Sequence, residues 1–92
     1  MKVSVCIPTY NQSLYIEQAI QSAAQQSHPP FEIIVSNDCS TDGTAEILEK
    51  LAKEIPSLKV FNQPVNLGMV PNTNAVLRLA TGEFIEIGRA HV

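Results

Sequence analysis

Two short polar segments contain the side chains that could do chemistry in this sequence. The first is Pro8-Thr9-Tyr10-Asn11, which brings a hydroxyl, an aromatic ring and an amide directly after an apolar run. A rigid turn with these groups can clasp a flat heterocycle by stacking and hydrogen bonding. The spacing alone favours a plainer interpretation, in which Tyr10 packs over a helix and Asn11 caps a turn. The segment is therefore a candidate ligand site that needs a second feature beside it.

The second segment runs from Ser36 to Thr44 and contains two carboxylates but no lysine or arginine. A carboxylate repels phosphate, yet it readily accepts hydrogen bonds from a base N–H or a ribose hydroxyl. Asp38 therefore suits the nucleoside end of a nucleotide. For Ser40 and Asp42 the spacing favours structural roles, because a hydroxyl at a cap and a carboxylate in the first turn stabilise the helix that follows.

Two common phosphate-binding motifs are missing from the sequence. No Gly-x-x-x-x-Gly-Lys segment occurs, and no Gly-x-Gly-x-x-Gly segment follows the first apolar run. The sequence therefore disfavours both a P-loop triphosphatase and a dinucleotide-binding enzyme. A phosphate that binds near Asp38 must be neutralised by a metal or by residues elsewhere.

Alternating apolar runs and amphipathic stretches must position these segments. Four short runs rich in β-branched residues predict strands at residues 3–7, 31–35, 58–61 and 84–85. Three apolar stripes at helical spacing predict helices between them, the first capped by Ser13. The stripes consist of Ile16, Ala19, Ile20, Ala23 and Ala24; of Leu48, Leu51, Ala52 and Ile55; and of Met69, Thr73, Val76, Leu77 and Ala80.

The resulting βαβαβαβ order predicts an α/β fold with a Rossmann-like parallel sheet, because right-handed crossovers place the helices on its faces. Ligands of such sheets bind beyond the carboxyl ends of the strands. Both polar segments follow strands, and so does a third, Asn62 to Gly68, whose glycine can adopt a positive φ. Asn74, in the last helix, could face a ligand or cap a loop. The expected buried core consists of Val5, Ile7, Ile33, Val35, Leu48, Leu51, Val60 and Leu77.

The amino-acid composition excludes several classes of function. The chain has 92 residues, of which 45% are hydrophobic, so it can form one domain with a core. Six Lys and Arg against nine Asp and Glu give a net charge of −3, and no basic stripe interleaved with aromatics occurs, so we expect no nucleic-acid partner. No apolar run is long enough for a transmembrane segment or a signal peptide. Together with two cysteines that we interpret as free thiols, this pattern predicts a cytoplasmic protein.

Four motifs in register resemble the amino-terminal half of family 2 glycosyltransferases. They are Val3 to Asn11, Glu32 to Thr44, Asn66-Leu67-Gly68 and Gly82-Glu83-Phe84-Ile85. Each motif alone is common, but the order and spacing of all four over residues 2–85 are specific. The resemblance implies that residues 1–85 are part of a GT-A fold, namely its Rossmann-like half that binds the nucleotide sugar.

The resemblance also implies a function. Such enzymes transfer a sugar from a nucleotide diphosphate sugar, here a UDP- or dTDP-sugar, to an acceptor hydroxyl with inversion, for example in cell-envelope polysaccharide biosynthesis. The nucleoside would be held by Pro8, Thr9, Tyr10 and Asp38. The family's preceding aspartate is Asn37 in this chain, which keeps a hydrogen-bond acceptor and loses the charge.

The resemblance stops after Ile85. Family members continue into an Asp-x-Asp motif that binds a divalent metal, magnesium or manganese, whereas residues 86–92 read Glu-Ile-Gly-Arg-Ala-His-Val. We expect the metal ligands and the catalytic base to lie outside this sequence, so that this chain alone is inactive and no catalytic residue is assigned. Residues 87–92 can be back-translated into the start of a sequencing adapter, which makes the tail a candidate artefact. A natural stop is the alternative.

Two other functions share much of this pattern. A non-catalytic nucleotide-binding module would keep the same site. A flavodoxin-like interaction domain would share the alternation of strands and helices without needing Tyr10 or Asp38. A glycosyltransferase with this sequence would act in the cytoplasm or at the inner face of the membrane.

Overall fold

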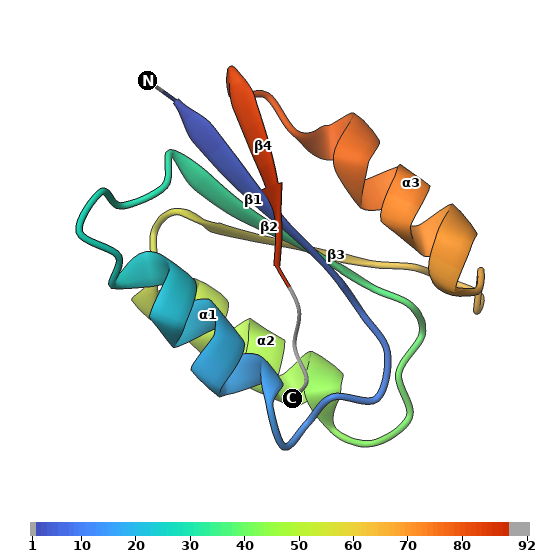
Figure 1. Cartoon of the computed structure of the whole chain (residues 1–92). Coiled ribbons are helices and arrows are strands. Elements are labelled where there is room, and N and C mark those ends of the chain that lie inside the picture. The colour runs from blue at the N-terminus through green and yellow to red at the C-terminus, as the bar shows by residue number, and fades with distance from the viewer. Residues whose placement is uncertain (1, 89–92) are drawn as a thin grey trace.

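The computed structural model describes residues 2–88, in which strands and helices alternate in the expected order (Figure 1). The elements are β1 (Val3–Thr9), α1 (Ile16–Ala24), β2 (Glu32–Asn37), α2 (Thr44–Glu54), β3 (Leu58–Asn62), α3 (Met69–Leu79) and β4 (Phe84–Ile87). The last strand continues two residues beyond Ile85, where the resemblance was expected to stop. Residues 89–92, which carry most of the adapter hypothesis, lie outside the described part of the chain.

The four strands form one sheet in the order β3-β2-β1-β4, and every pair is parallel. Thr9 lies opposite Asn37, and Asn37 lies opposite Asn62, so β1, β2 and β3 end at the same level. The order reverses at β1, which is the position where Rossmann-like sheets bind ligands. A flavodoxin-like sheet would instead place β3 beside β1. The flavodoxin-like alternative is therefore wrong.

Helices cover both faces of the sheet, with α1 and α2 on one side and α3 on the other (Figure 1). Six of the eight expected core residues are fully buried: Val5, Ile7, Ile33, Val35, Leu48 and Leu51. Val60 is only half-buried because β3 is an edge strand, and Leu77 is half-buried beside a smaller cluster of Cys6, Ile34 and Val76.

The buried stripe of α3 differs from the expected one. Val76 is buried and Leu77 and Ala80 pack beside it, as expected, but Met69 is 82% exposed and Asn72 is buried instead. Residues four apart lie on one face of a helix, so the stripe passes through an asparagine that apolar periodicity could not reveal.

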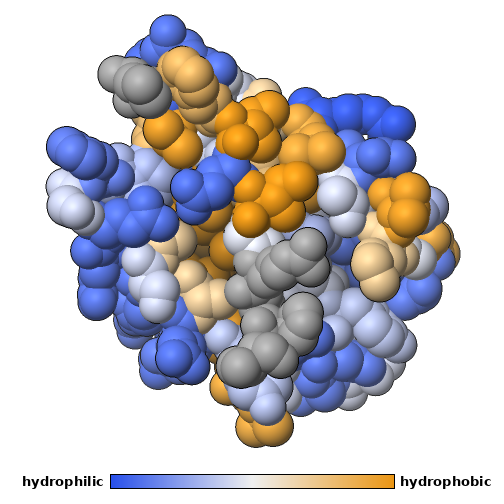
Figure 2. All heavy atoms as spheres, viewed as in Figure 1, coloured by the Kyte–Doolittle hydropathy of each residue, from blue (hydrophilic) through white to orange (hydrophobic). Residues whose placement is uncertain are grey.

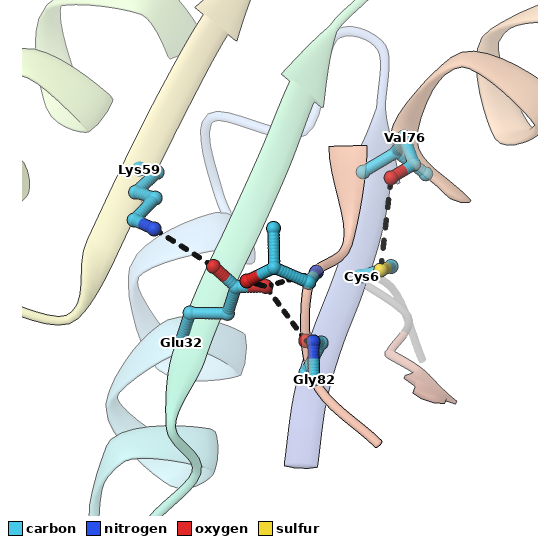
Figure 3. Close-up of polar contacts among 7 residues, drawn as sticks. Cys6, Glu32, Lys59, Val76 and Gly82 are labelled. Atoms are coloured by element: carbon cyan, nitrogen blue, oxygen red, sulfur yellow. Dashed lines mark hydrogen bonds and ion pairs between the residues drawn. The ribbon is translucent and has the colours of Figure 1, made fainter. Parts of the chain in front are cut away.

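A buried carboxylate joins the start of β2 to the segment before β4 (Figure 3). Glu32 accepts hydrogen bonds from Ser4 Oγ at 2.7 Å and from the amide of Thr81 at 2.7 Å, and it forms a 2.8 Å ion pair with Lys59. Burial alone would raise the pKa of Glu32, but the hydrogen bonds from Lys59, Ser4 and Thr81 outweigh burial and lower the pKa to about 2. The carboxylate is therefore ionised at neutral pH and holds three strands together.

Gly82 belongs to the same cluster, since its amide donates to Ser4 Oγ at 2.8 Å. A Cβ atom at residue 82 would lie 2.6 Å from Ser4 Oγ and 2.8 Å from the carbonyl oxygen of Lys2. The first position of the Gly-Glu-Phe-Ile motif is thus a glycine because β1 passes too close for any side chain.

Beyond this cluster, β4 is an edge strand with an apolar surface. Phe84, Ile85 and Ile87 are each about half exposed. Figure 2 shows apolar side chains gathered on the face over β4. Among the helices of residues 2–88, none is long and apolar enough to cross a membrane.

Candidate functional site

The candidate site lies where β1, β2 and β3 end. The amide of Asp38 donates to the carbonyl oxygen of Thr9 at 2.8 Å, so the two polar segments identified in the sequence meet directly. The loops that follow β1 and β2 run side by side (Figure 1). Tyr10 is 46% exposed and leaves its ring accessible, while Pro8 is half-buried at the end of β1. The structure therefore brings together all four residues predicted to hold a nucleoside.

Thr9 contributes an unusual hydroxyl. The residue is only 3% exposed, and its Oγ1 has no hydrogen-bond partner among the described residues. Buried side-chain oxygens nearly always have a partner, because an unmet hydrogen bond in the interior is costly. The Thr9 hydroxyl is therefore an unpaired group just beneath the surface, at the position where the resemblance expects a ligand.

Asp38 is 2% exposed, and its carboxylate holds the third loop against the other two. One oxygen accepts from the amide of Leu67 at 2.6 Å and the other from the amide of Gly68 at 2.9 Å. The side chain of Asn66 adds a 3.2 Å bond to the carbonyl oxygen of Asp38. Each carboxylate oxygen keeps a second lone pair, so Asp38 combines a structural role with capacity for one more donor.

A group of reciprocal hydrogen bonds joins the loop after β1 to the loop after β2. The amide of Thr41 donates to Asn11 Oδ1 at 2.8 Å, and the amide of Gln12 donates to Thr44 Oγ1 at 3.1 Å. The amide of Ser13 donates to Asp42 Oδ2 at 3.1 Å. Ser13 is therefore not the cap of α1, whose N-cap is Tyr15 without a side-chain bond.

Asp42 has the expected structural role, since its Oδ1 accepts from the amide of Thr44 at 3.1 Å, at the start of α2. Burial would raise the pKa of Asp42, but hydrogen bonds from Thr44 and Ser13 prevail and lower it to about 2. The expectation for Ser40 was wrong in detail, because Ser40 does not cap α2. Its hydroxyl instead donates to Asn37 and accepts from the amide of Asn11.

The sequence interpretation missed a buried polar cluster beneath the site. Asn72 donates to the carbonyl oxygen of Ser36 at 3.0 Å and accepts from Ser36 Oγ at 2.7 Å. Gln63 donates to the same hydroxyl at 3.0 Å. Asn74, the asparagine singled out earlier, is exposed. The four-residue spacing of Asn72 and Val76 was the available signal, but it competed with a longer apolar stripe.

Comparison with known proteins decides the family. The family model for glycosyl transferase family 2 matches residues 4–87. The chain belongs to glycosyl transferase family 2. This family 2 chain is 40% identical over 83 residues to the putative teichuronic acid biosynthesis glycosyltransferase TuaG of Bacillus subtilis, covering 90% of the chain and 33% of TuaG. It is 42% identical over 88 residues to the poly(ribitol-phosphate) beta-N-acetylglucosaminyltransferase TarS of Staphylococcus aureus, covering 92% of the chain and 15% of TarS.

Solved structures agree on the fold of this family 2 chain. The crystal structure of S. aureus TarS 1-349 in complex with UDP superposes with a TM-score of 0.86 at 40% identity, covering 98% of the chain and 27% of TarS 1-349. The mannosyltransferase PcManGT from Pyrobaculum calidifontis, in complex with GDP-Man and Mn2+, gives 0.81 at 31% identity, covering 91% and 26%. The sheet and helices are the nucleotide-binding half of a GT-A fold. The chain spans a third or less of the length of TuaG and TarS.

The described residues do not fit the divalent metal that the resemblance implies. Within residues 2–88, no three His, Cys, Asp or Glu side chains lie close enough together to bind an ion. Asp38 and Asp42, the acidic side chains near the carboxyl ends of the strands, already accept main-chain hydrogen bonds with both oxygens. A divalent cation needs several free oxygen ligands. Within the described residues, no cluster of side chains is therefore suited to hold a divalent metal.

Proposed function

We propose that the chain is the nucleotide-sugar-binding part of a glycosyltransferase that passes a sugar from a UDP- or dTDP-sugar to an acceptor hydroxyl with inversion. The observation that carries this proposal is the meeting of Thr9, Tyr10 and Asp38 at the point where the strand order reverses. The similarity to TarS 1-349 in complex with UDP supports a uridine nucleotide as the ligand.

The residues at this edge suit a pyrimidine nucleoside in three ways. Tyr10 offers an exposed ring on which a base can stack. The Thr9 hydroxyl lacks a partner and can bond a polar atom of the base or sugar. Asp38 can accept a hydrogen bond from the ring N–H of uracil or thymine through its remaining lone pairs. Pro8 sets the direction in which the chain leaves β1.

The proposed reaction requires that the acceptor oxygen bond to the anomeric carbon while the bond to the nucleoside diphosphate breaks on the opposite face. The acceptor hydroxyl gives its proton to a base as it attacks. In this proposal the described residues bind and orient the nucleoside end of the donor. The base and the groups that neutralise the diphosphate lie elsewhere, so this chain by itself binds nucleotide without transferring sugar.

The acceptor class follows from the same relatives. TuaG is named for teichuronic acid biosynthesis and TarS for poly(ribitol-phosphate). These names support a role in cell-envelope polysaccharide synthesis, with the donor bound in the cytoplasm or at the inner face of the membrane. A non-catalytic nucleotide-binding module would bind the same ligand.

A nucleotide panel tests the proposal. Saturation-transfer NMR with UDP, dTDP, GDP and ADP should give strong transfer to UDP or dTDP and weak transfer to both purine nucleotides. The Asp38→Ala chain is the matched control and should show reduced transfer from the base protons. Equal transfer to all four nucleotides, or to none at millimolar concentration, would remove the nucleoside site.

A further inference from the structure

A line of neutral hydrogen bonds runs along the carboxyl edge of the sheet from β3 to the loop after β1. Asn37 Nδ2 donates to Asn62 Oδ1 at 3.0 Å. Asn37 Oδ1 accepts from the hydroxyl of Ser40, and Ser40 Oγ accepts in turn from the amide of Asn11 at 2.9 Å. The line consists of one amide and one hydroxyl between two fixed ends, and none of its members carries a charge.

The direction of each proton in this line follows from its neighbours. Ser40 Oγ receives the Asn11 N–H, so its single proton is free for Asn37. The oxygen of Asn37 therefore faces Ser40, and its NH2 group faces Asn62. Asn37 is 2% exposed, so water has little access to its own side-chain atoms in these bonds. An aspartate at position 37 could keep the bond from Ser40 but could not donate to Asn62.

The line ends at a strained residue next to the candidate nucleoside site. Asn11 has a backbone φ of 50°. This value lies in the left-handed region, which residues other than glycine and asparagine seldom adopt. Two bonds hold it there: its amide donates to Ser40, and its Oδ1 accepts from the amide of Thr41. Asn11 directly follows Tyr10, so the turn held by these two bonds is the one that carries the exposed ring of Tyr10.

We propose that Asn37 is a positioning residue that acts through Ser40 to fix Asn11, and with it Tyr10, at the nucleoside site. The inference rests on the proposed function, because it takes Tyr10 to face the nucleoside. It gives a role to the position at which this chain departs from the Asp-Asp pattern. The acceptor oxygen of residue 37 is what the site requires, and the donor group serves only the contact with β3.

Four variants of the full chain separate this role from general stability. Asn37→Leu removes both bonds of the side chain, and Ser40→Ala removes the link to Asn11. Asn37→Asp keeps the acceptor for Ser40. Asn62→Ala is the matched control, since it removes the far end of the line and leaves the Ser40 and Asn11 contact in place.

Hydrogen exchange of the Asn11 amide and the UDP dissociation constant are measured for each variant. Asn37→Leu and Ser40→Ala should each speed exchange and weaken UDP binding about fivefold, the scale of one hydrogen bond. Asn37→Asp and Asn62→Ala should leave both values within about twofold. The double variant with Asn37→Leu and Ser40→Ala should bind UDP no more weakly than either single variant, because both substitutions break the same series of hydrogen bonds.

Different results would contradict the positioning role of Asn37 and the proposed binding of a nucleotide. Unchanged exchange at Asn11 in Ser40→Ala overturns the inference, as does equal weakening in Asn62→Ala. Loss of binding in Asn37→Asp that matches Asn37→Leu also overturns it, because the acceptor was retained. Failure of the unsubstituted chain to bind UDP overturns the proposed function, while exchange at Asn11 still decides the positioning. If Asn37→Leu fails to fold, Ser40→Ala can be compared with Asn62→Ala in its place, since Ser40 is only partly buried and its substitution should be tolerated.

Discussion

The carboxylate of Asp38 accepts a 2.9 Å hydrogen bond from the amide of Gly68, across 30 residues of sequence. The amide of Leu67 occupies the other carboxylate oxygen at 2.6 Å. One side chain at the end of β2 therefore fixes the loop that leads into α3. The main-chain amide of the same residue donates to Thr9, so Asp38 holds both the third loop and the end of β1.

Replacing Asp38 with alanine should affect both folding and binding. The substitution leaves the Leu67 and Gly68 amides without partners, so the melting temperature should fall. UDP binding should weaken by roughly 1.5–3 kcal/mol, the scale of a charge-assisted hydrogen bond. Calorimetric titration of a stably folded chain measures the second effect, and Asp38→Asn, which keeps one acceptor, should lie between. An unchanged dissociation constant for Asp38→Ala would take this residue out of the site.

Thr9→Val tests the hydroxyl that has no partner. Valine has nearly the same shape, so the unliganded chain should lose less than about 0.5 kcal/mol of unfolding free energy, because no hydrogen bond within the chain is broken. UDP binding should weaken by about 1 kcal/mol if the ligand supplies the missing partner. Thr44→Val is the control, since Thr44 Oγ1 accepts from Gln12, and its loss should destabilise the chain. Equal UDP affinity in Thr9→Val and the unsubstituted chain would speak against a ligand contact.

The sequence predicted the strands, the helices and the parallel sheet because each relied on local periodicity. The stripes of α1 and α2 are apolar throughout, and they face the core as expected. The stripe of α3 was correct at Val76, Leu77 and Ala80, but its start was misplaced. Asn72 is buried there instead of Met69, through its bonds to Ser36, a partner 36 residues away. Periodicity detects apolar faces, and it cannot detect a polar side chain that is buried because a distant residue satisfies it.

The candidate site was predictable only in part, because some of its contacts join residues that are far apart in the sequence. Thr9, Tyr10 and Asp38 could be predicted to lie together because they lie at the carboxyl ends of strands that are neighbours in the sheet. The bonds from Asp38 to Leu67 and Gly68 could not be read from the sequence, since backbone amides carry no side-chain signature. The role of Ser40 was missed because a hydroxyl before a helix usually caps it, whereas here it bridges two loops.

Glu32 should make the chain sensitive to acid. Folding lowers the pKa of Glu32 from 4.5 to about 2, so its contribution to stability is complete above about pH 4.5 and is lost as the pH falls toward 2. Glu32→Gln should lower the unfolding free energy at pH 7 by about 2 kcal/mol and flatten its decline in that range. Urea unfolding at pH 7 and pH 3 measures both effects.

A matched exposed carboxylate provides the control for Glu32. Glu49 forms a 3.9 Å ion pair with Lys53 on the surface of α2, and Glu49→Gln should cost less than about 0.5 kcal/mol. Some decline should remain in Glu32→Gln, because the pKa of Asp42 is also lowered, to about 2. A Glu32→Gln chain that loses as much stability in acid as the unsubstituted chain would contradict this role.

Gly82→Ala should destabilise the attachment of β4. The new methyl group would meet the main-chain oxygen of Lys2 and the side chain of Ser4, which forces β1 and the segment before β4 apart. Overpacking of this kind costs about 1–3 kcal/mol. Gly43→Asn is the control, because nothing lies within 4 Å of a Cβ there, so it strains the backbone at a φ of 98° before α2 without a steric clash. Hydrogen exchange in β4 that is no faster in Gly82→Ala than in Gly43→Asn would contradict the predicted clash.

The most direct test of the nucleoside site is a titration of the isotope-labelled chain with UDP, followed through its amide resonances. The account predicts saturable shifts at Thr9, Tyr10 and Asp38 and in the loop of Leu67 and Gly68, with little change in α2 or at the Glu32 cluster. GDP at the same concentrations should give smaller shifts at these positions. Shifts centred away from the carboxyl ends of β1 and β2, or no saturable shift at millimolar UDP, would contradict the account.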